Sequence, residues 1–134
     1  MGNLEAGLRC TLRLDGFTSG MDEPVILVVT TFPDMENARR IAAGLVETGH
    51  AACVNLLPGV ESFFRWEGKI HHDNEVVGLI KTTRAALPGL QDALRGLHPY
   101  TCPESLVFPA DGGLEAYLDW VRASVGQTAD PGLR

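Results

Sequence analysis

The sequence predicts one α+β domain, a ferredoxin-like βαββαβ sandwich in which an antiparallel sheet carries two helices and is followed by an added C-terminal helix. Two observations predict this fold. Strand-like and helix-periodic segments follow one another in that order over residues 24–126. A length of 134 residues with 45% hydrophobic and 21% charged residues is typical of a single domain with an ordinary hydrophobic core.

The first strand and the first helix are expected between residues 25 and 49. The run 25–32, VILVVTTF, has the β-branched composition of a strand that is buried on both faces. Asp34 is suited to cap a helix whose apolar residues recur at positions 38, 41, 42, 45 and 46, the spacing of one helical face. Gly49 is expected to end this helix in the left-handed conformation.

A long hairpin is expected next. Residues 51–66 are strand-like but contain Pro58-Gly59, where proline cannot donate a ladder hydrogen bond and a bulge or bend is expected. A short turn, Glu67-Gly68-Lys69, leads into a second strand over residues 70–83.

Three further elements complete the pattern. Leucines at 87, 90, 94 and 97 form one stripe of a helix that stops before Pro99, and residues 105–108 form a short strand ended by Pro109. The last helix is expected over residues 114–125. Residues 1–23 are interpreted as a flexible N-terminal extension and residues 127–134 as a polar tail.

The first strand is apolar on both sides, yet both crossover helices are expected on one face of the sheet. The other face therefore needs a cover, and a partner subunit is the simplest one. Trp120 lies off the apolar stripe of the last helix, which weakly supports a partner; the alternative is that Trp120 folds back onto its own sheet.

Composition excludes several classes of protein. The net charge of −6, without a cluster of lysines and arginines, disfavours nucleic acid as a partner. Cys10, Cys53 and Cys102 form no C-x-x-C pair, which argues against disulfides and favours a reducing compartment. No apolar stretch approaches the ~20 residues of a membrane span, so no membrane association is expected.

The best candidate site is the loop 98–104, HPYTCPE, because two prolines restrict a segment rich in polar and aromatic groups. One interpretation is a metal site that uses His98 with Cys102 or Glu104, and another is a polar ligand pocket built from the same groups. The alternative is a rigid connector in which His98 caps the preceding helix and Cys102 is buried.

Other candidates are weaker. His71 and His72 are adjacent, so strand geometry points them to opposite faces and a solvated hairpin is favoured over a metal site. Cys53 is interpreted as a small buried side chain, because no basic residue is adjacent to it in the sequence. Lys81 interrupts an apolar strand, and Glu104 is its candidate carboxylate partner. No phosphate-binding loop, dinucleotide fingerprint or nucleophile elbow occurs, so no enzyme is predicted.

A series of ordered motifs resembles the CutA family of divalent cation tolerance proteins over about residues 25–125. The resemblance implies a cytoplasmic homotrimer with a ferredoxin-like fold, in which extended hairpins close sheet faces between subunits. It also implies a role in tolerance to copper and other divalent metals. The motifs that carry it are residues 30–34 (TTFPD), 51–55 (AACVN), 58–59 (PG), 64–69 (FRWEGK), 81–83 (KTT) and 98–100 (HPY).

The resemblance also implies a site. Copper ligands proposed in the family are a cysteine late in the first strand and two histidines before the Pro-Tyr pair. The matching positions here are Thr30, Leu97 and His98, so one of three ligands is present, and Cys102 is a candidate substitute. A pocket near a subunit boundary is implied, formed by Trp66, Lys81, His98, Tyr100 and Glu104.

The leading hypothesis is thus a trimeric, non-enzymatic protein of metal tolerance that binds a divalent ion such as copper or zinc weakly and requires no cofactor. The alternative is a small-ligand sensor resembling the trimeric PII signalling proteins, with a nucleotide or another anion bound between subunits.

Overall fold

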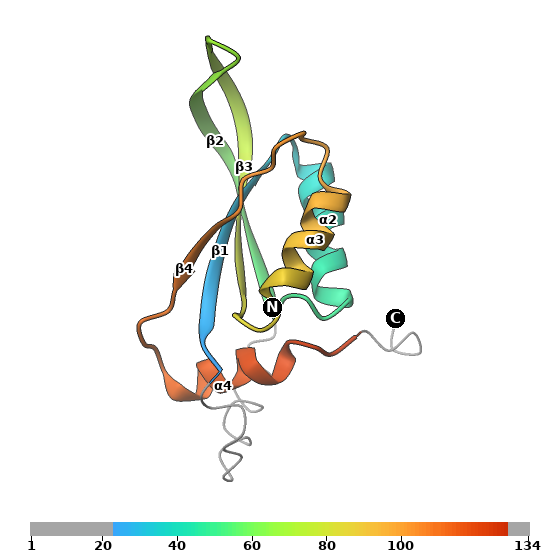
Figure 1. Ribbon diagram of the computed structural model, residues 1–134, viewed down its shortest axis with the longest axis vertical. Coiled ribbons are helices and arrows are strands. Elements are labelled where there is room, and N and C mark those ends of the chain that lie inside the picture. Colours follow the sequence, from blue (N-terminus) through green and yellow to red (C-terminus); the bar gives the residue numbers. More distant parts are fainter. Residues whose placement is uncertain (1–22, 129–134) are drawn as a thin grey trace.

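The computed structural model describes residues 23–128 and contains seven helices and strands in that range (Figure 1). The predicted extension therefore lies outside the described residues except for Glu23, and the tail lies outside except for Gln127 and Thr128. The elements are β1 (Val25–Phe32), α2 (Met35–Glu47), β2 (Cys53–Trp66), β3 (Lys69–Thr83), α3 (Leu87–Leu97), β4 (Leu106–Pro109) and α4 (Glu115–Ser124).

The four strands form one antiparallel sheet in the order β2-β3-β1-β4. Helices α2 and α3 lie together on one side of the sheet, and α4 lies across one end of it (Figure 1). The β2–β3 hairpin projects beyond the helices at the other end. This is the ferredoxin-like arrangement with an added C-terminal helix, so the predicted fold class is confirmed.

The core lies between the sheet and the two crossover helices. Along β1 the even-numbered side chains from Ile26 to Phe32 are fully buried, because successive side chains of a strand point to opposite faces and these face α2 and α3. Ile41 and Leu45 of α2 and Leu90 and Leu94 of α3 complete the same cluster. The predicted cap is also present, since the Asp34 carboxylate accepts a hydrogen bond from the backbone of Asn37 at 2.7 Å.

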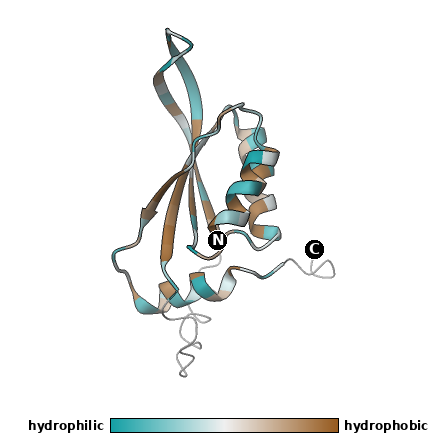
Figure 2. Cartoon of the chain, in the orientation of Figure 1, coloured by the Kyte–Doolittle hydropathy of each residue, from teal (hydrophilic) through white to brown (hydrophobic). Residues whose placement is uncertain are grey.

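The opposite face of the sheet is only partly covered. Helix α4 packs Val121 against Val25 and Ala52, and Trp120 joins that small cluster, so Trp120 folds onto its own sheet. Beyond α4 the apolar side chains of this face remain partly accessible. Figure 2 shows that the central strands are largely hydrophobic. The accessible side chains come from three strands: Leu27, Val29, Val77, Leu79, Leu106 and Phe108.

The hairpin contains the irregularity expected at Pro58-Gly59. The β2–β3 register shifts between Leu57 and Val60, and Gly59 has a positive φ of 77°. The predicted three-residue turn is wrong, however. Trp66 pairs directly with Lys69, so the turn has two residues, Glu67 and Gly68, both with positive φ as a primed hairpin turn requires.

The remaining boundaries differ by one or two residues from the prediction. Pro109 pairs with Ile26 and is the last residue of β4. Proline has no N–H to donate to a neighbouring strand, and this is tolerated at the end of an edge strand. Glu23 is tied to the domain rather than to the predicted extension: its carboxylate accepts from the Ala85 N–H, and its carbonyl accepts from Arg122. No helix within residues 23–128 combines the length and hydrophobicity of a membrane span.

Glu67 is a non-glycine residue with φ of 51°, a conformation that costs an ordinary side chain about 1 kcal/mol. Asparagine tolerates it better. We expect Glu67→Asn to raise the free energy of unfolding by about 0.5 kcal/mol, measured by thermal unfolding at fixed protein concentration. Glu67→Gln is the matched control, since it removes the charge but keeps the backbone preference. Equal stabilisation by both variants would show that charge, and not the turn, is responsible.

Candidate functional site

The loop from α3 to β4 is held in place by His98. Its Nε2 lies 2.7 Å from the Thr31 carbonyl oxygen, and its Nδ1 lies 3.1 Å from the backbone nitrogen of Tyr100. A carbonyl can only accept and a backbone N–H can only donate, so His98 is a neutral imidazole with its proton on Nε2. The ring also stacks on Phe32 and is only 7% exposed. Both ring nitrogens are therefore occupied.

The next residues of the loop reach the hairpin. The Tyr100 hydroxyl donates a hydrogen bond of 2.6 Å to Oε2 of Glu75 on β3. At the far end of the loop, the hydroxyl of Ser105 accepts a hydrogen bond from Gln91 of α3. The loop is consequently fixed to β1, β3 and α3, and its polar groups have defined positions.

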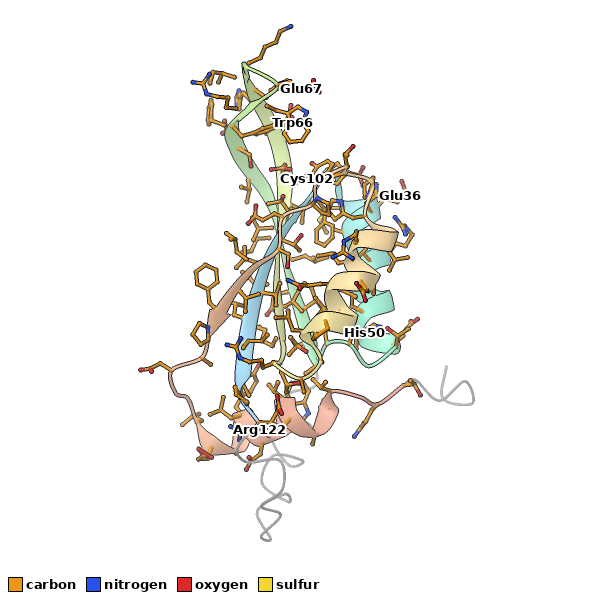
Figure 3. The ribbon with its side chains drawn as sticks, viewed as in Figure 1. Glu36, His50, Trp66, Glu67, Cys102 and Arg122 are labelled. Atoms are coloured by element: carbon orange, nitrogen blue, oxygen red, sulfur yellow. The ribbon has the colours of Figure 1, made fainter. Side chains whose placement is uncertain are left out.

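A cavity of about 700 Å³ lies between this loop and the projecting part of the hairpin. One group of lining residues is acidic: Asp73 and Glu75 of β3 and Glu104 of the loop. Cys102, which is exposed, lines it as well, and Figure 3 shows Cys102 on the loop and Trp66 near the tip of the hairpin. The aromatic lining residues are Phe63, Phe64, Trp66 and Tyr100.

The cavity is electrostatically negative. None of its lining residues, all of which belong to the described chain, is Lys, Arg or His. Burial, and secondly the charge of Glu75, raise the pKa of the Glu104 carboxyl above its usual value. Burial and the hydrogen bond to Glu75 likewise raise the pKa of the Tyr100 phenol, which keeps it a donor. A cation entering the cavity would relieve the repulsion between these carboxylates.

Most of the predicted pocket residues gather at this cavity. Trp66, Tyr100 and Glu104 line it, and so does Cys102 from the predicted metal set. His98 does not line it but holds the loop that does. Asp73 and Glu75 were missed as pocket residues, although their spacing of two along a strand indicates that they share one face.

Lys81 lies elsewhere. It is six residues from Glu75 along β3, a separation of roughly 20 Å, and it pairs with Cys53 across the β2–β3 ladder. Its ammonium donates to the Asn55 side chain and lies 3.9 Å from the Cys53 sulfur. The expected Lys81–Glu104 pair is therefore wrong within this chain. Strand register brings Lys81 opposite Cys53, a basic neighbour that adjacency in the sequence does not reveal. The expectation that Cys53 is buried is wrong, because its side chain is only partly buried.

The two adjacent histidines of the hairpin are separated as strand geometry requires. His71 stacks on Phe64 and His72 stacks on Phe63, each across the β2–β3 ladder. His72 also lies 2.9 Å from Glu61. Within residues 23–128 no three His, Cys, Asp or Glu side chains converge closely enough to hold one metal ion.

Thr30, the position that corresponds to a proposed copper-ligating cysteine in the family, faces the helix layer and is fully buried. Its hydroxyl oxygen has no hydrogen-bond partner among the described residues. The neighbouring Thr31, on the other face of β1, is the one that lines the cavity. The cavity and the buried Thr30 position are thus on opposite faces of the strand.

These features define a ferredoxin-like α+β domain in which a projecting hairpin and the α3–β4 loop border an open cavity with acidic and aromatic lining residues. Residues 26–124 match the family described as CutA1 divalent ion tolerance protein. The chain therefore belongs to this family.

Individual relatives support the same assignment. The divalent-cation tolerance protein CutA of Thermus thermophilus is 46% identical over 104 residues, which are 78% of this chain and 99% of that protein. The human protein CutA is 41% identical over 75% of this chain, but only 56% of its own length is spanned. The solved structure from Thermus thermophilus has a TM-score of 0.75 at 45% identity and covers 76% of this chain and 99% of its own.

The rice CutA1 crystal structure has a TM-score of 0.77 at 37% identity, covering 80% of this chain and 97% of its own. The fold is thus shared over nearly the whole length of these solved proteins. The order of strands and helices in this shared fold is the ferredoxin-like order that the sequence predicted.

The raised pKa of Glu104 makes stability depend on pH. The folded chain binds the Glu104 proton more tightly than the unfolded chain does. The resulting stabilisation is therefore present at low pH and is lost as the pH rises through the pKa that Glu104 has in the folded chain. We expect Glu104→Gln to unfold at a higher temperature than the wild type at about pH 7 and at the same temperature near pH 4. Thermal unfolding across this range tests it; an equal difference at both pH values would contradict the assignment.

Proposed function

We propose that this member of the CutA family acts in tolerance to divalent metal ions, copper included, as a non-enzymatic protein that binds the ion weakly at the acidic cavity. The observation that carries the proposal is the charge of the lining: three carboxylates and a thiol, with no basic side chain among the lining residues. The relative from Thermus thermophilus is named a divalent-cation tolerance protein, which supports the same role.

The charge of the cavity also bears on the alternative, a PII-like sensor of a nucleotide or another anion. An anion would be placed beside Asp73, Glu75 and Glu104 with no lining cation to compensate, which is costly at short range. A divalent cation gains from the same charges. The cavity therefore favours a cation over an anionic effector.

The proposed ligands are Cys102 and Glu104, and His98 completes the set that the sequence predicts. In this conformation ligation by His98 would break its hydrogen bond to Thr31 or to Tyr100, so its main contribution is to position the loop. Two ligands bind an ion more weakly than the three or four of a structural site. Weak, reversible binding suits a protein that responds to an excess of metal.

Calorimetric titration of Zn(II), repeated with Cu(II), into the reduced protein in a weakly competing buffer tests this site. We expect saturable binding that Cys102→Ser and Glu104→Gln each weaken by about tenfold or more, because each removes one ligand. His98→Ala should weaken it as well, since the loop loses its anchor. Cys53→Ser is the matched control, because that thiol lies outside the cavity. Binding that only Cys53→Ser affects would reject the site.

We further propose a homotrimer in the cytoplasm. The support is the incompletely covered face of the sheet, where Leu106 is 54% exposed and Phe108 is 47% exposed beside the apolar centre of β1 and β3. Covering such a face with another subunit removes this apolar area from water, at about 25 cal/mol per Å².

Light scattering at micromolar concentration should give three chain masses for the wild type. We expect the double variant Leu106→Asp/Phe108→Asp to dissociate, because two carboxylates would be buried in an apolar interface. Leu114→Asp is the matched control, since Leu114 is 82% exposed at the start of α4 and belongs to none of the strands of that face. A monomeric wild type would reject the trimer.

A further inference from the structure

We draw no further inference here: the strongest candidate, the side-chain cluster of Cys53, Asn55 and Lys81 on the neighbouring strands β2 and β3, is one cysteine held by hydrogen bonds within its own cluster on the sheet face that the proposed trimer covers, and nothing in the structure shows what it would bind.

Discussion

The candidate site depends on the two hydrogen bonds of one buried imidazole. His98 donates to the Thr31 carbonyl at the end of β1 and accepts from the Tyr100 N–H at the start of the loop. If either bond were lost, a buried donor or acceptor would be left without a partner, at a cost of about 1–3 kcal/mol. The two bonds therefore stabilise the observed position of the loop. That position brings the Tyr100 hydroxyl to Glu75, and it sets Cys102 and Glu104 on the wall of the cavity.

The carboxylates of the cavity differ in the groups that surround them. The Tyr100 hydroxyl donates a hydrogen bond to one oxygen of the buried Glu75. Glu104 has no such donor among residues 23–128, and its burial, and secondly the charge of Glu75, raise its pKa. The cavity thus contains one carboxylate with a hydrogen-bond donor from the protein, Glu75, and one whose charged form is disfavoured, Glu104. A cation is the group that would favour the charged form, which is why charge, rather than ligand geometry, supports the proposed function.

The sequence predicted the fold well because the relevant signals are local. Each signal depends only on residues that are close in the sequence. Examples are the run of β-branched residues before Pro33, the Asp34 cap and the leucine stripe of α3. The loop was identified for the same reason. Register, by contrast, is a property of two strands, and the bulge at Pro58-Gly59 shifts it. For that reason Lys81 was paired with Glu104 instead of Asn55, and the role of Glu75 in the cavity was missed.

The cavity and the uncovered sheet face are continuous, which couples the two proposals. Leu27, Val29 and Thr31 alternate along one side of β1; the first two belong to the uncovered face, and Thr31 lines the cavity. A subunit that covers Val29 and Leu106 would therefore border the cavity. A ligand that binds the assembled form more tightly than the separate chain must stabilise the assembly by the same factor. Occupancy of the cavity by a cation and association of the subunits are then linked equilibria, with β1 as the strand that contributes to both.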